Sequence, residues 1–399
     1  MRILFLSRWF PYPTNNGSKL RVYHLLRGLA TRHEVTLISF ADELNRQPDL
    51  ATVSDICADV HVAPWRDFAP ESWAARAAFF SPTPRAVVST HSPAMAAAVR
   101  DCTQRRQYDL VIASQLATAA YLKHTETVPA LFDELESGVY WEQYVQAGSR
   151  THRLRQGLMW HKYRRYVAHL LHNFAAVTVA SAHEADLLAK LTVRPLRYEV
   201  IPNCVDAQAY RNVTAPALRN ELIFTGPFRY HANHDAMVWF LEHVYPRIQA
   251  AVPDVTLTIT GDHADLPLPP ATNVTLTGQV PDVRPLVAGA TCSIVPLQIG
   301  GGTRLKILES MALGTPVVST HMGAEGLDAR HDEHLLLADA PDAFAAAVVR
   351  ALGDAALRRR LAAAGRALVH ARYDWDAVMP RFLNLVDDVA LQRATVHNA

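Results

Sequence analysis

The chain has 399 residues, with 39 Lys and Arg against 38 Asp and Glu, and half of its residues are apolar. This length allows two or three domains with large cores, and the composition excludes a chain that is disordered throughout. A formal net charge of +1 excludes a general electrostatic attraction to nucleic acid or to an anionic membrane. The four scattered cysteines form no CxxC pair, so neither a disulfide framework nor a zinc knuckle is indicated, and a reducing compartment is expected.

The first apolar run, Met1 to Ser7, is too short for a signal peptide and is interrupted by Arg8. It predicts a buried strand instead, because Pro11 and Gly17 follow it closely. No later stretch reaches about 18 uninterrupted apolar residues, so no helix is expected to span a membrane. The sequence therefore favours a cytoplasmic protein, which at most lies against the inner face of a membrane.

Short apolar strands alternate with helical patterns through the first half of the chain. Strands are predicted at Ile3–Ser7, Val35–Phe40, Asp109–Ser114, Ala130–Phe132, Ala176–Ala180 and Tyr198–Ile201. The first helix is predicted over Lys19–Thr31, and a later one begins at Ser181, whose spacing to Glu184 is that of a capping box. Strands that alternate with helices indicate a parallel sheet covered on both faces.

The alternation starts again after a less regular stretch between residues 206 and 220. Strands are predicted at Leu222–Thr225, Thr256–Thr260, Val274–Thr277, Cys292–Pro296, Pro316–Ser319 and His334–Leu337. A final helix follows Tyr373-Asp374-Trp375 and carries an apolar stripe that must be buried. The fold class is therefore α/β, with two Rossmann-like domains that are expected to face a central cleft.

The segment from Gly300 to Val318 carries the strongest functional signal. Three glycines precede a predicted helix of about three turns, and Gly314 caps the end of that helix. Glycines allow a ligand to approach the backbone, and the first turn of a helix offers free N–H groups that suit phosphate. Arg304 and Lys306 add positive charge in that turn, and Glu309 can accept hydrogen bonds from ribose hydroxyls. The pattern favours a nucleotide site over an ordinary surface turn.

Together these segments resemble GT-B fold glycosyltransferases of the GT4 type, also called glycosyl transferase group 1. In the second half, the resemblance rests on Glu221–Gly226, Tyr230–Ala236, Gly278–Asp282, Gly300–Val318 and Gly323–Leu327. In the first half, it rests on Pro11–Gly17, Ser181–Leu188 and Ile201–Asp206. The resemblance covers nearly the whole chain. It implies an acceptor-side domain over residues 1–206, a donor-binding domain over 207–374, and a last helix, 375–399, that crosses back to the first domain.

The resemblance also implies roles for single residues in binding a nucleotide-sugar donor, such as a UDP- or GDP-sugar. Glu309 would bind the ribose, and Arg304 and Lys306 would neutralise the diphosphate. Backbone groups would contact the sugar, the diphosphate or the base at Gly17, Val280, Gly301, Gly302 and Thr303. Gly301 stands where the family often has a carboxylate, and only Arg229 stands near the place where the family often has an Arg and a Lys.

Asp133 and Glu134 are the candidate catalytic residues. Many relatives have a histidine in a segment that resembles H-x-x-E-S, and here Asp133 takes the histidine position. A carboxylate there could stabilise an oxocarbenium-like sugar or accept the proton of the acceptor hydroxyl. The alternative for Asp133 is a helix N-cap. No Asp-x-Asp motif stands at a predicted strand end, so neither a metal site nor a cofactor is expected.

The acceptor is suggested by a stretch without acids between Gln143 and His183, where basic and aromatic residues are interleaved. A basic amphipathic helix at 150–172, with the aromatic-rich stretch 65–80, would suit peripheral contact with an anionic membrane or a lipid-linked acceptor. The alternative is a core helix with a solvated basic face. No recognised nucleic-acid motif accompanies these residues, so no nucleic-acid partner is expected.

The function predicted from the resemblance is a retaining, metal-independent glycosyltransferase that moves a sugar from a nucleotide sugar to a glycan, a lipid-linked or another acceptor. Synthesis of cell-surface polysaccharide or glycoconjugate is expected by analogy with the family. A GT-B fold nucleotide-sugar epimerase and a nucleotide-binding protein without turnover stay open as alternatives. A dinucleotide oxidoreductase is disfavoured, because Asn15-Asn16-Gly17 does not match G-x-G-x-x-G.

Overall fold

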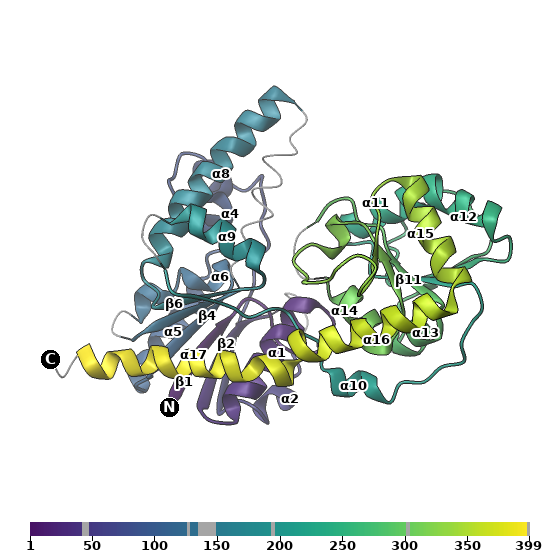
Figure 1. Ribbon diagram of the computed structural model, residues 1–399. Helices are drawn as coiled ribbons and strands as arrows, with labels where there is room; N and C mark the ends of the chain where they lie inside the picture. Colours follow the sequence, from purple (N-terminus) through teal and green to yellow (C-terminus); the bar gives the residue numbers. More distant parts are fainter. Residues whose placement is uncertain (42–47, 126–127, 135–148, 193–195, 301–303, 397–399) are drawn as a thin grey trace. The chain divides into compact units, whose positions relative to one another are not determined.

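The computed structural model of the chain describes residues 1–41, 48–125, 128–134, 149–192, 196–300 and 304–396 (Figure 1). The chain forms two compact units. Unit 1 comprises Met1–Pro202 and Met379–Ala399, and unit 2 comprises Asn203–Val378. The chain thus passes between the units after Pro202 and again within its last helix, whereas the sequence analysis placed these changes after residues 206 and 374.

Unit 1 is built on a seven-stranded parallel sheet in the order β3-β2-β1-β4-β5-β6-β7. Its strands are β1 (Arg2–Ser7), β2 (Glu34–Phe40), β3 (Asp59–Ala63), β4 (Leu110–Ser114), β5 (Ala130–Asp133), β6 (Ala176–Val179) and β7 (Tyr198–Val200). The central strands are buried on both faces, which explains their nearly unbroken apolar sequences. The edge strand β3 was not predicted, because polar residues alternate with apolar ones along it.

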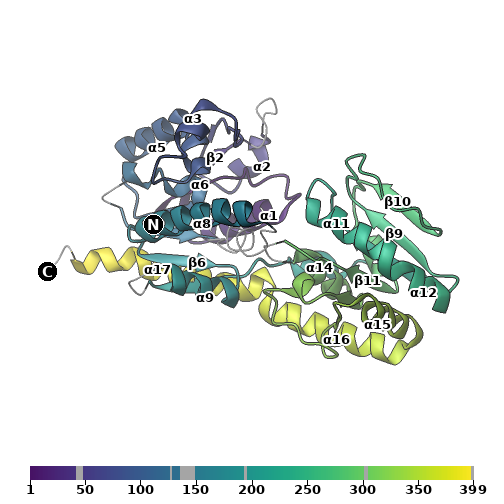
Figure 2. The same ribbon diagram turned by 90° about the horizontal axis from the view of Figure 1, so that it is seen from above.

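Helices cover the sheet of unit 1 (Figure 2). They are α1 (Gly17–Ala30), α2 (Leu50–Ser54), α3 (Trp73–Ala77), α4 (Arg85–Ser89), α5 (Pro93–Arg105), α6 (Leu116–Ala119), the short 3-10 turn η1 (Leu122–His124), α8 (Arg150–Leu171) and α9 (Ala182–Leu191). Helices α5, α8 and α9 pack on one core with strand residues such as Leu4 and Ile38. The part of α17 (Trp375–Val396) that belongs to unit 1 runs beside α1 (Figure 1), where Gly28 leaves room for Met379.

Unit 2 repeats the architecture with a six-stranded parallel sheet in the order β10-β9-β8-β11-β12-β13. Its strands are β8 (Glu221–Thr225), β9 (Thr256–Thr260), β10 (Val274–Gly278), β11 (Cys292–Val295), β12 (Val317–Ser319) and β13 (Leu336–Leu337). Its helices are α10 (Ala207–Arg211), α11 (His231–Trp239), the π-turn η2 (Phe240–Val244), α12 (Tyr245–Ala251), α13 (Arg284–Gly289), α14 (Leu305–Leu313), the 3-10 turn η3 (Met322–Ala324), α15 (Pro341–Gly353) and α16 (Ala355–Arg372).

The strand orders show where each unit can bind a ligand. The order reverses between β1 and β4 in unit 1, and between β8 and β11 in unit 2. In open parallel sheets, ligands bind outside the carboxyl ends of the strands at such a switch point. The prediction of two Rossmann-like α/β units is confirmed. Among the helices that the structure describes, none has the length and apolar character needed to cross a membrane.

Candidate active site

Two glycines shape the switch point of unit 2. Gly226 follows β8 and Gly261 follows β9, with φ of +140° and +117°. A Cβ on Gly261 would lie 2.7 Å from the carbonyl carbon of Gly226, and a Cβ on Gly226 would lie 3.0 Å from Nζ of Lys306. The two strand ends therefore pack backbone against backbone, which only glycine permits. This packing brings the end of β8 next to the ammonium group of Lys306.

Lys306, in the first turn of α14, places its ammonium group at this switch point. Its Nζ donates to Oδ1 of Asn233 at 2.8 Å and lies 4.3 Å from the centroid of the Phe224 ring. Asn233 is fixed in turn, because its Nδ2 donates to the carbonyl of Pro227 at 2.8 Å. Burial and, to a smaller extent, the nearby Arg304 lower the pKa of Lys306 to about 7, while Glu309 opposes the shift. No carboxylate pairs with the ammonium group at hydrogen-bond distance within the described residues.

Glu309 lies one turn further along α14 than Lys306. Its Oε1 accepts a hydrogen bond from the hydroxyl of Tyr210 at 3.2 Å. Burial raises the pKa of Glu309, while the Tyr210 hydrogen bond and Lys306 lower it. Burial and the Glu309 charge also raise the pKa of Tyr210, so this phenol stays a donor. The carboxylate is thus held in a fixed orientation on the same helix as the ammonium group of Lys306.

The other donor-site residues predicted from the sequence have varied surroundings. Arg304 is 5% exposed and donates to the backbone carbonyl groups of Gly300 and Met322, so its guanidinium joins two loops. Arg229 is exposed and pairs with Asp262. Val280 is half-buried in the loop after β10. Three further predicted residues, Gly301, Gly302 and Thr303, lie outside the described residues.

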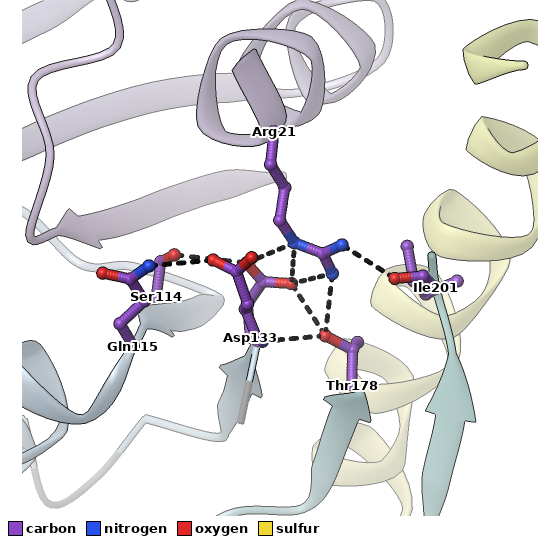
Figure 3. Close-up of polar contacts among 7 residues, drawn as sticks. Arg21, Ser114, Gln115, Asp133, Thr178 and Ile201 are labelled. Carbon is purple, nitrogen blue, oxygen red and sulfur yellow. Dashed lines mark hydrogen bonds and ion pairs between the residues drawn. The ribbon is translucent and has the colours of Figure 1, made fainter. Parts of the chain in front are cut away.

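At the carboxyl end of the sheet in unit 1, Asp133 forms a buried ion pair with Arg21 (Figure 3). Nη2 of Arg21 lies 2.7 Å from Oδ1 of Asp133, and both side chains are fully buried. Thr178 donates to the same oxygen at 2.7 Å, Ser114 donates to the other at 3.2 Å, and Arg21 also donates to the carbonyl of Ile201 at 2.7 Å. Asp133 is therefore a buried carboxylate, and both of its oxygens accept hydrogen bonds from internal donors. Whether it caps a helix depends on residues that lie outside the described ones.

Glu134 follows Asp133 and lies at the same edge of the sheet. Its Oε2 accepts a hydrogen bond from Nε2 of Gln115 at 2.9 Å, and the Gln115 amide also donates to Oγ of Ser18 at 3.1 Å. Ser18 is in the first turn of α1, next to the predicted site residue Gly17, which is the first residue of that helix. The structure thus brings Gly17, Asp133 and Glu134 to one end of unit 1.

Several residues of both clusters were not recognised in the sequence. Asn233 lies in the Tyr230–Ala236 segment, whose resemblance to a family motif was the one available signal for it. Tyr210, Arg21, Gln115 and Thr178 lie in no motif and are brought in by the fold alone. Within the described residues, no group of three or more His, Cys, Asp or Glu side chains could hold a metal ion.

Comparison with known proteins adds two family models that match successive parts of the chain. The model described as Glycosyltransferase Family 4 matches residues 15–209. The model described as Glycosyl transferases group 1 matches residues 219–354.

Two curated relatives align with the chain. An uncharacterized 44.6 kDa protein in the cps region of Klebsiella pneumoniae is 23% identical over 377 residues, which covers 87% of this chain and 90% of that protein. A phosphatidyl-myo-inositol mannosyltransferase of Mycobacterium leprae is 29% identical over 212 residues, covering 50% of this chain and 56% of that protein.

Two solved structures are similar over nearly their whole length. Anabaena HepE in complex with UDP and glucose is 16% identical with a TM-score of 0.67, covering 97% of this chain and 100% of that chain. Sucrose-phosphate synthase of Thermosynechococcus elongatus is 19% identical with a TM-score of 0.69, covering 97% of this chain and 98% of that chain. These likenesses show that the chain shares the two-domain α/β fold of those proteins.

Proposed function

Since this chain belongs to the group 1 glycosyltransferases of family 4 and has the GT-B fold, we propose that it transfers a sugar from a nucleotide-sugar donor with retention and without a metal ion. The observation that carries the proposal is the pair Lys306 and Glu309 on one helix at the switch point of unit 2. Retention follows from the family resemblance.

The donor site matches the chemistry of a nucleoside diphosphate. The Lys306 ammonium group and the first turn of α14 supply positive charge for the diphosphate. Glu309 supplies an oriented carboxylate for the ribose hydroxyls. Positive charge from Lys306 and the helix can stabilise the leaving diphosphate, which is the work that a metal ion does in other transferases. HepE, which is similar in fold, was crystallised with UDP and glucose, and this supports a nucleotide sugar as the donor.

In the proposed reaction, the oxygen of the acceptor hydroxyl forms a bond to the anomeric carbon of the sugar. The bond from that carbon to the diphosphate breaks, and the nucleoside diphosphate leaves with the bonding electrons. The hydroxyl proton passes to the carboxylate of Glu134, which later releases it to water. Asp133 is a positioning residue, since its carboxylate is already paired with Arg21.

A panel of nucleotide sugars tests the proposed function. We expect the purified protein to release nucleoside diphosphate from one donor, and to do so faster when a lipid extract supplies acceptor. Binding of donors without release would contradict transfer and favour a nucleotide-binding protein. Interconversion of the donor sugar without transfer would instead favour an epimerase.

For the acceptor, we propose a lipid-linked glycan that is reached at an anionic membrane surface. Unit 1 carries a basic-aromatic surface, formed by exposed residues of 65–80 and of α8. Trp73 is 84% exposed, Phe80 89% and Leu154 79%. Lys162 of α8 joins the two segments, because it donates to the carbonyl of Phe79 and lies 5.2 Å from the centroid of that ring.

The charge of this surface fits an anionic lipid layer. Five exposed arginines of α8 have no acidic partner among the described residues: Arg150, Arg153, Arg155, Arg164 and Arg165. Exposed aromatic rings beside basic side chains are typical of helices that lie in a membrane interface. The K. pneumoniae relative is named for a cps region, and the M. leprae relative for phosphatidyl-myo-inositol. Both names support an acceptor in the synthesis of cell-surface glycans.

Changing Trp73 and Phe80 together to serine should weaken binding to vesicles of phosphatidylglycerol and phosphatidylcholine by about tenfold or more, because both rings lose apolar burial. The measurement is co-sedimentation with these vesicles and with phosphatidylcholine alone. Leu276→Ser is the matched control, since Leu276 is 50% exposed in unit 2. Equal binding of the double variant and the natural protein would contradict the proposed surface.

A further inference from the structure

Gln115 and Glu134 both have a positive backbone φ angle. Gln115 is the first residue after β4 and Glu134 the first after β5, with φ of +67° and +60°. Residues other than glycine rarely adopt positive φ, because this conformation is strained for a residue with a side chain. Strands β4 and β5 are neighbours in the sheet, so two strained turns lie side by side. Such strain is found most often where a side chain must be aimed.

The network around Asp133 holds both turns in place (Figure 3). The backbone N–H of Gln115 donates to the carbonyl of Asp133 at 2.9 Å, and the N–H of Glu134 donates to Oγ1 of Thr178 at 3.2 Å. Thr178 itself donates to the Asp133 carboxylate, which Arg21 neutralises. The buried Arg21–Asp133 pair and Thr178 therefore hold the backbone of both turns in place.

The strained turns aim two side chains at each other. The Gln115 amide donates to the Glu134 carboxylate at 2.9 Å and to the Ser18 hydroxyl at 3.1 Å. One amide thus joins the ends of β4 and β5 to the first turn of α1. Gln115 directly follows β4, one of the two strands at the switch point, so this junction borders the expected ligand site.

We propose that Gln115 is a positioning residue for Glu134, holding its carboxylate aimed at the acceptor hydroxyl. This assignment rests on the proposed function. The hydrogen bond from Nε2 of Gln115 to Oε2 of Glu134, at 2.9 Å, fixes the orientation of that carboxylate.

Gln115→Gly tests this assignment without adding backbone strain, because glycine adopts positive φ freely. We expect kcat to fall about 10- to 100-fold, which corresponds to a lost hydrogen bond to a charged group, while KM for the donor is unchanged. Gln115→Asn, whose amide is too short to reach Glu134, should behave in the same way.

Gln249→Ala is the matched control, because Gln249 is a half-buried amide in unit 2 that donates to Thr272. Thermal unfolding of each variant separates stability from catalysis. A Gln115→Gly protein with natural kcat would overturn the assignment while the proposed function stood. If the natural protein showed no transfer at all, the proposed function would fail, and this assignment with it.

Discussion

Replacing Asp133 by leucine should lower the free energy of unfolding of unit 1 by about 3–5 kcal/mol, the usual cost of leaving one buried charge without its partner. Arg21 would then lose the carboxylate that pairs with its fully buried guanidinium. Arg21→Met should cost a similar amount for the same reason. The double variant should recover much of the loss, because apolar side chains of similar volume can replace a buried ion pair at little cost.

Unit 1 contains a matched exposed pair for comparison. Arg381 and Glu199 are also 2.7 Å apart, but their side chains are 50% and 39% exposed. Arg381→Met should therefore cost at most about 1 kcal/mol. Hydrogen exchange of peptides from β5 and β6 reports the opening free energy of unit 1 separately from unit 2. A loss below about 1 kcal/mol for Asp133→Leu would contradict the network described here.

Lys306→Met should weaken binding of a nucleotide sugar by about 10- to 100-fold, because a charge-assisted hydrogen bond to the diphosphate is lost. The affinity of the Lys306→Met protein for the nucleoside without phosphates should stay unchanged. Glu309→Gln should weaken binding of both ligands, since its carboxylate is assigned to the ribose that both contain. Arg229→Met should have a much smaller effect, because Arg229 is exposed and paired with Asp262. Titration calorimetry measures all three, and equal losses for both ligands in Lys306→Met would contradict its assignment.

The pKa of Lys306 also predicts how donor binding depends on pH. Burial lowers this pKa to about 7, so the ammonium group of the free protein loses its proton as the pH rises through that value. The phosphates of a nucleotide sugar are diesters, whose charge is constant over this range. Donor affinity should therefore fall as the pH rises above about 7, and binding there should take up a proton. Calorimetry in buffers of different ionisation enthalpy detects that proton, and Lys306→Met should abolish both effects.

The central strands of both units could be predicted from the sequence, because strands that are buried on both faces give short apolar runs. The edge strand β3 could not, since Asp59 and His61 interrupt the pattern. For α8, the sequence showed a basic amphipathic helix but not which residues are covered. In the structure Tyr163 and Val167 are buried, whereas Leu154 is exposed. Tertiary packing decides which residues of α8 are buried, and the periodicity of the sequence alone does not predict this.

The two candidate clusters differ in how far the sequence could predict them. Lys306 and Glu309 are three residues apart on one helix, so their proximity follows from helix geometry. Arg21 and Asp133 are 112 positions apart, and an arginine in a helix is ordinarily expected at the surface. Gln115 gave no signal either, because positive φ is usually marked by glycine or asparagine. The residues that support the site could not be predicted from the sequence, because the fold, rather than a motif, brings them together.

A crystal structure of the protein with a bound nucleotide sugar tests the central claim most directly. The account predicts diphosphate oxygens at hydrogen-bond distance, about 2.7–3.2 Å, from Nζ of Lys306, and ribose hydroxyls at the same range from the Glu309 carboxylate. A nucleotide bound elsewhere, with Lys306 still bonded to Asn233 and no phosphate near it, would contradict the account.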